Sequence, residues 1–285
     1  MPYTENYYKS NDGLNLYYRK YDGDKARMPL VCLSGLTRNS GDFSDFSDHF
    51  SGERVIYTLD YRGRGKSDYD PDFENYNPQT YLGDIMSFLH AEGIEKAVFV
   101  GTSLGGLLTM GLAGLVPQYV AGAVINDVGP EVDSSGGERI AGYVGKDVRF
   151  PSIEAATAAQ KTQYQSAYPD LDDEGWRKTT EVGLIWDGKA ENFRPNYDLG
   201  LGEALQAQIS GDDPIDLWPF FEAMKSVPVL AIRGALSDVL SAEVFQKMQD
   251  LNPHMTSVTL ENRGHTPLLN EPIALNHLTR FLKNV

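Results

Sequence analysis

Residues 97–110 read AVFVGTSLGGLLTM, and this stretch decides the fold of the chain. The apolar run at 97–100 is rich in strand-forming residues, and the leucines after the turn suit a buried helix. We therefore expect a strand, a sharp turn and a helix, with Ser103 on the turn. Gly101 and Gly105 flank the serine at the two positions where larger side chains would collide. A serine on such a turn projects its hydroxyl outward, so Ser103 is a candidate nucleophile.

Two other interpretations of the same turn need testing. In the first, Ser103 only caps the helix that follows. In the second, the glycine-rich turn binds a dinucleotide, but Gly101, Gly105 and Gly106 do not fit the spacing G-x-G-x-x-G. No cofactor and no metal ion are therefore expected.

The composition narrows the classes of partner. The chain has 285 residues and a net charge of −15, with 40 acidic and 25 basic residues. Such a surface repels nucleic acid and anionic membranes, so we expect a small-molecule substrate instead. The one cysteine, Cys32, lies in an apolar run and is expected in the core. The N-terminus lacks the basic and apolar regions of a signal peptide, which predicts a cytoplasmic protein.

Apolar runs alternate with amphipathic segments along most of the chain. This alternation predicts an α/β fold with a mostly parallel central sheet and helices on both faces. The segment 129–211 is different, because it is polar, helical and rich in Tyr and Trp. We expect residues 1–128 and 212–285 to form the core and residues 129–211 to form a helical cap. Ligands bind at the carboxyl ends of such strands, so a cap inserted there would cover the site.

A serine nucleophile needs a base, and the base needs a third group to orient it. His265 follows the last expected strand, and Asp238 follows the strand that ends at residue 232. Asp127, at the end of the strand after the 97–110 turn, is the alternative acid. The sequence R-G-x-x-S-D favours Asp238, and the order serine, acid, histidine is that of the nucleophile-elbow hydrolases.

The motifs SGL, GTSLGG, RGALSD and RGHTP together resemble the α/β-hydrolase superfamily, in its branch with a helical cap. The resemblance implies that Ser103 is the nucleophile, that His265 is the general base and that Asp238 orients the imidazole. It also implies an oxyanion hole built from the backbone N–H groups of Leu36 and Leu104. The family usually has His-Gly where this chain has Ser34-Gly35, so the loop must be braced differently.

Ser103 points to acyl transfer, since relatives that are haloalkane dehalogenases or epoxide hydrolases depend on an aspartate at this position. We expect hydrolysis of a carboxylic ester or lactone through an acyl-enzyme. The alternatives are a receptor that binds a small ligand with little turnover, and hydrolysis of C–C or thioester bonds. Arg38, Tyr143 and Trp186 are candidate substrate-binding residues, and the oligomeric state stays open.

Overall fold

The computed structural model describes residues 2–210 and 215–285. In these residues one sheet has the strand order β1-β2-β4-β3-β5-β6-β9-β10, and β1 and β2 run antiparallel to their neighbours while the others are parallel. The strands are β1 (Thr4–Lys9), β2 (Asn15–Tyr21), β3 (Leu30–Leu33), β4 (Ile56–Leu59), β5 (Ala97–Thr102), β6 (Val120–Asn126), β9 (Val229–Gly234) and β10 (Thr256–Leu260). The predicted mostly parallel sheet is confirmed.

Alternate residues of the central strands point to opposite faces of the sheet. In β3, Val31 and Leu33 join the core on one face, whereas Leu30 and Cys32 join the core on the other. All four are buried, as expected for a strand that is covered by helices on both sides. This is why the sequence of β3 is continuously apolar rather than alternating.

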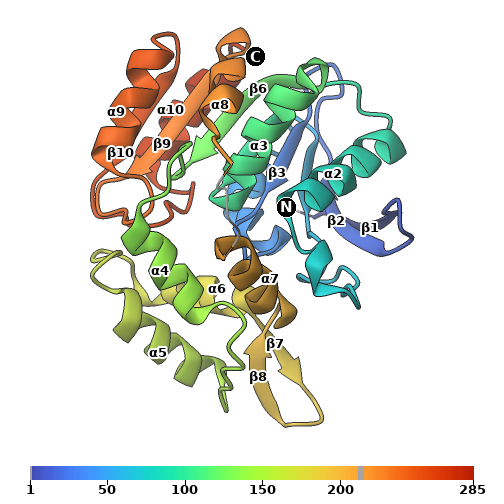
Figure 1. Ribbon diagram of the computed structural model, residues 1–285, viewed down its shortest axis with the longest axis vertical. Helices are drawn as coiled ribbons and strands as arrows, with labels where there is room; N and C mark the ends of the chain where they lie inside the picture. The colour runs from blue at the N-terminus through green and yellow to red at the C-terminus, as the bar shows by residue number, and fades with distance from the viewer. Residues whose placement is uncertain (1, 211–214) are drawn as a thin grey trace.

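Helices cover both faces of the sheet (Figure 1). Side chains of α2, α3, α8 and α9 belong to the core on one face, and those of α1 and α10 to the core on the other. These helices are α1 (Ser44–Phe50), α2 (Pro78–Glu92), α3 (Leu104–Leu115), α8 (Trp218–Ala223), α9 (Ala242–Leu251) and α10 (Pro272–Leu282).

Residues 134–209, which we call the inserted segment, lie together beyond one end of the sheet (Figure 1). They form α4 (Ser134–Tyr143), α5 (Ile153–Tyr164), α6 (Asp173–Gly183), β7 (Leu184–Asp187), β8 (Asn192–Pro195) and α7 (Gly200–Ile209). The antiparallel hairpin β7–β8 is not expected from the sequence, because each of its strands is only four residues long and contains polar residues. The expected boundary at residues 211 and 212 lies outside the described residues.

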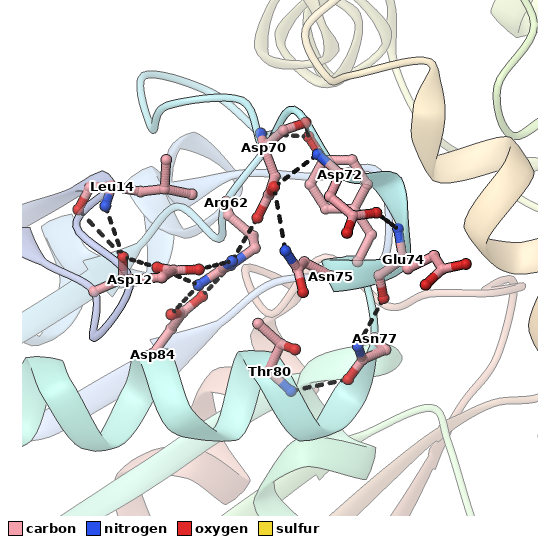
Figure 2. A network of polar contacts seen from close by, with 12 residues as sticks. Asp12, Leu14, Arg62, Asp70, Asp72, Glu74, Asn75, Asn77, Thr80 and Asp84 are labelled. Carbon is pink, nitrogen blue, oxygen red and sulfur yellow. Dashed lines mark hydrogen bonds and ion pairs between the residues drawn. The ribbon is translucent and has the colours of Figure 1, made fainter.

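The basic loop 60–67 is built around a buried arginine (Figure 2). Arg62 makes ion pairs with Asp12, Asp70 and Asp84 at 2.6–2.7 Å, and 2 % of its side chain is exposed. Three carboxylates satisfy the guanidinium, as a buried charge requires. Arg62 therefore holds the loop as a structural turn, and this network ties the β1–β2 turn, the loop and α2 together.

None of the helices in the described ranges combines the length and the apolar character that crossing a bilayer demands.

Candidate active site

Ser103 lies on a strained turn between β5 and α3. Its backbone angles are φ 52° and ψ −117°, which L-residues rarely adopt. The neighbouring glycines make this turn possible, because a Cβ on Gly105 would lie 2.0 Å from the carbonyl oxygen of Leu33. A Cβ on Gly101 would lie 2.3 Å from the carbonyl oxygen of Gly105. The strand, turn and helix predicted from the sequence are all present.

His265 faces Ser103 across the carboxyl end of the sheet. Its Nε2 atom lies 2.8 Å from Ser103 Oγ, which is hydrogen-bond distance. Only 9 % of the imidazole side chain is exposed. The two residues are 162 positions apart in the chain, and the parallel sheet brings them together. This is the geometry that a general base and its nucleophile require.

The carboxylate that contacts His265 is Asp127, which was the alternative acid. Its Oδ2 atom lies 2.8 Å from His265 Nδ1, and its side chain is fully buried. Asp127 Oδ1 accepts a hydrogen bond from the backbone N–H of Gly234 at 2.7 Å. Asp127 follows β6 directly and has a φ of 57°, which non-glycine residues rarely adopt. A buried carboxylate with these donors orients the imidazole.

The preference for Asp238 is wrong, because this carboxylate is bound elsewhere. Arg139 on α4 donates from Nε and Nη2 to the two oxygens of Asp238, at 2.5 and 2.8 Å. The hydrogen bonds from Arg139 hold the pKa of Asp238 below its usual value, although partial burial opposes this. Sequence motifs could not show that Asp238 is bound to Arg139, because Arg139 lies in the inserted segment and no motif specifies how that segment packs.

The loop at Ser34–Leu36 lies beside the nucleophile. A Cβ on Gly35 would lie 3.7 Å from Ser103 Cβ, and the N–H of Gly105 donates to the carbonyl oxygen of Ser34 at 3.1 Å. In the described ranges, neither Leu36 N–H nor Leu104 N–H donates to a protein acceptor. Leu104 is the first residue of α3, where an amide has no intrahelical partner. Both N–H groups are therefore free to donate, and their assignment to an oxyanion hole stays a prediction.

The inserted segment binds the loop that carries His265. The N–H of Gly264 donates to the carbonyl oxygen of Ala167 at 2.7 Å, and the Tyr168 hydroxyl donates to the carbonyl oxygen of Thr266 at 3.0 Å. These two contacts lie on either side of His265. In the sequence, Tyr168 does not differ from the other aromatic residues of the segment. Its hydrogen bond to Thr266 depends on how the inserted segment packs against the loop of His265.

Two of the three candidate substrate-binding residues lie near the site. Arg38 packs beside Gly35, whose added Cβ would lie 3.5 Å from Arg38 Cγ, and its guanidinium binds Asp42 at 2.5 and 2.8 Å. Burial raises the pKa of Tyr143, an effect that the adjacent Arg139 partly offsets. Arg38 also lies close enough to Tyr143 to oppose the rise in its pKa. Substrate contact by Arg38 and Tyr143 stays a prediction.

Trp186 does not belong to this group. It lies on the exposed hairpin β7–β8, is 50 % exposed and packs against Phe193 with ring centroids 5.0 Å apart. This exposed position gives no support to its assignment to the substrate pocket. The contact that Trp186 makes is with Phe193 on the neighbouring strand β8.

Residues 30–277 match the sequence model of a family described as "Alpha/beta hydrolase family". The chain belongs to this family. A solved structure of an α/β hydrolase from Novosphingobium aromaticivorans has 41 % identity and a TM-score of 0.95, with 99 % of each chain covered. The present chain is 32 % identical over 269 residues to a 3-hydroxybutyrate-oligomer hydrolase of Cupriavidus necator, and the match covers 91 % of the present chain and 90 % of the relative. An sn-1-specific diacylglycerol lipase of Mus musculus is 27 % identical, covering 88 % of this chain and 80 % of that one.

These comparisons confirm the family and the fold that the motifs predicted for this α/β hydrolase. The proteins similar to it include hydrolases of the esterase and lipase type. Among the described residues, no three His, Cys, Asp or Glu side chains are grouped so that they could hold a metal ion.

Proposed function

We propose that this protein is a serine hydrolase that cleaves a carboxylic ester or lactone through an acyl-enzyme. The observation that carries the proposal is the chain of contacts from Ser103 Oγ to His265 Nε2 and from His265 Nδ1 to Asp127 Oδ2, each 2.8 Å long. A hydroxyl, an imidazole and a buried carboxylate in this order are the parts of a catalytic triad.

In the first step, His265 takes the proton of Ser103 as the hydroxyl oxygen attacks the substrate carbonyl. Asp127 holds the imidazole in the tautomer that presents Nε2 to the serine, and it stabilises the imidazolium that forms. The N–H groups of Leu36 and Leu104 stabilise the oxyanion of the tetrahedral intermediate, a contribution of about 3 to 4 kcal/mol for each donor.

In the next steps, His265 returns the proton to the leaving alcohol, and the C–O bond of the tetrahedral intermediate breaks. The acyl group is then bound to Ser103. A water molecule, deprotonated by His265, attacks the acyl-enzyme and releases the acid. The same parts serve a lactone, in which the leaving alcohol stays attached to the acyl group.

The relatives support an ester as the substrate. Diacylglycerol and oligomers of 3-hydroxybutyrate both contain carboxylic ester bonds, and two proteins similar to this chain are named for acting on them. We propose that the inserted segment is a cap over the site, with Arg38 and Tyr143 contacting the substrate. Its hydrogen bonds to the loop of His265 support this part of the proposal.

The test uses wild type, Ser103→Ala and the control Ser87→Ala, which changes a serine on α2 away from the site. We expect wild type and the control to release p-nitrophenol from short acyl esters and to be labelled by a fluorophosphonate, and Ser103→Ala to do neither. Wild-type turnover by Ser103→Ala would contradict the proposal. A panel of esters, lactones, thioesters and diketones separates the bond types, and labelling without multiple turnover would favour a receptor.

A further inference from the structure

The Ser34–Leu36 loop is held at its carbonyl oxygens. The carbonyl oxygen of Ser34 accepts from Tyr61 Oη at 3.2 Å, in addition to the N–H of Gly105. The carbonyl oxygen of Gly35 accepts from the N–H of Arg38 at 3.1 Å. These bonds brace a loop in which Ser34 replaces the histidine that the family usually has.

Arg64 holds the third carbonyl. Its Nε donates to the carbonyl oxygen of Leu36 at 2.9 Å, and its Nη1 donates to the carbonyl oxygen of Arg62 and to Tyr81 Oη, both at 2.8 Å. The Arg64 residue is 0 % exposed. Since all three carbonyls are engaged, the orientation of the peptide groups between them is fixed, and with it the direction of the Leu36 N–H.

The charge of Arg64 is unusual for a buried residue. Within the described residues it makes no ion pair with a carboxylate, whereas Arg62 binds three (Figure 2). Tyrosine rings surround it instead, with its Cζ 4.7–5.7 Å from the ring centroids of Tyr61, Tyr76 and Tyr81. Its Nη2 is buried and has no hydrogen-bond partner in this part of the chain.

Keeping a cation in the core without a carboxylate is costly, even over aromatic faces. A neutral side chain could fill the same space between the tyrosines. The hydrogen-bond partner of the guanidinium is informative. Arg64 donates to the carbonyl oxygen of Leu36, and the N–H of the same Leu36 is a candidate oxyanion donor. In a site of low dielectric, a positive charge near a developing negative charge is only weakly screened.

We propose that Arg64 is a positioning residue for the oxyanion hole. It fixes the Leu36 N–H in its orientation, and its positive charge favours the anionic transition state over the neutral substrate. The inference rests on the proposed serine hydrolase function. It assigns a role in that function to a buried residue that does not touch the substrate.

The experiment compares Arg64→Met, which removes the charge and the hydrogen bonds, with Arg64→Lys, which keeps the charge. Active sites are counted with a fluorophosphonate, and kcat and KM are measured with p-nitrophenyl butyrate. For Arg64→Met we expect kcat for each labelled site to fall about 10- to 100-fold, with KM within about twofold of wild type, since a displaced donor costs less than the 10²–10³ of a missing one. Arg64→Lys is expected to lose less than Arg64→Met.

A second readout separates positioning from folding. A trifluoromethyl ketone forms a tetrahedral oxyanion with the serine, so its affinity is expected to fall in parallel with kcat. A structural role alone would lower the number of labelled sites and leave both kcat for each site and the inhibitor affinity unchanged, which would overturn the proposal. Equal losses in Arg64→Met and Arg64→Lys would overturn the contribution of the charge.

A milder variant covers the case in which Arg64→Met does not fold. Tyr81→Phe removes only the hydroxyl that accepts from Arg64 Nη1, and its matched control is Tyr18→Phe, which removes a hydrogen bond to Glu92 in the same core. We expect kcat to fall about two- to fivefold in Tyr81→Phe and to stay unchanged in Tyr18→Phe. A wild-type protein without labelling or turnover would contradict the proposed function itself, whereas active Arg64 and Tyr81 variants would contradict only the role of Arg64.

Discussion

Ser237 and Asp127 share a hydrogen bond at the carboxylate oxygen that faces the histidine. The Ser237 hydroxyl donates to Asp127 Oδ2 at 2.7 Å, and the same oxygen lies 2.8 Å from His265 Nδ1. Ser237 Oγ in turn accepts from the N–H groups of Val239 and Leu240 at 3.2 Å. The loop that was expected to supply the acid Asp238 therefore supplies a serine that orients Asp127.

The first prediction separates the two carboxylates. Asp127→Asn removes the charge that orients and stabilises the imidazole, so kcat/KM for p-nitrophenyl butyrate is expected to fall about 10⁴-fold. Asp238→Asn keeps the contact between His265 and Asp127, and its kcat/KM is expected to stay within about threefold of wild type. A larger loss in Asp238→Asn than in Asp127→Asn would return the role of the acid to Asp238.

The second prediction concerns the pH dependence of the Asp238–Arg139 ion pair. Arg139 lowers the pKa of Asp238 in the folded state, so the pair stabilises the protein above the unfolded pKa of about 3.9. This stabilisation is lost as the pH falls through the lower, folded pKa. The Asp238 side chain is 36 % exposed, so solvent screening limits the contribution to about 1 kcal/mol or less.

The measurement for this ion pair is urea denaturation of wild type and Asp238→Asn between pH 3 and pH 8. We expect a constant difference in the free energy of unfolding from pH 5 upward, and a smaller difference toward pH 3. A difference that grows as the pH falls would contradict the assignment.

The third prediction concerns Tyr168, which joins the inserted segment to the loop of His265. Tyr168→Phe loses the hydrogen bond to the carbonyl oxygen of Thr266, which is worth about 1 kcal/mol of stability. Because the loop gains freedom next to the histidine, kcat is expected to fall about three- to tenfold while KM changes little. The control is Tyr119→Phe, which loses a contact with His90 at the surface. Equal kcat values for both variants would show that this tether does not position His265.

The fourth prediction tests the sharp turn. Gly105→Ala would bring a Cβ to 2.0 Å from the carbonyl oxygen of Leu33, so we expect it to cost about 3 kcal/mol or more of stability and to displace Ser103. The matched control is Gly83→Ala on α2, where an added Cβ meets nothing within 4 Å. This control is expected to raise stability by up to about 1 kcal/mol, since alanine favours a helix. Thermal melts of both variants check the pair, and an unchanged melting temperature in Gly105→Ala would refute the argument.

The sequence by itself determined the fold and two of the three residues in the candidate triad. Apolar periodicity and the glycines around Ser103 are local features, and each constrains the backbone within a few residues. The alternation of strands and helices implied the parallel sheet, and this placed Ser103 and His265 at one edge.

Only the tertiary structure decided which carboxylate faces His265. Asp127 and Asp238 both follow strands at the same edge, so their places in the chain do not decide which one reaches His265, and the motif R-G-x-x-S-D favoured the wrong one. The choice depends on Arg139, which reaches Asp238 from the inserted segment, and on Ser237, which fills the space beside Asp127. The same holds for Arg64 and Tyr168, because a hydrogen bond between distant segments depends on packing that no short stretch of sequence encodes.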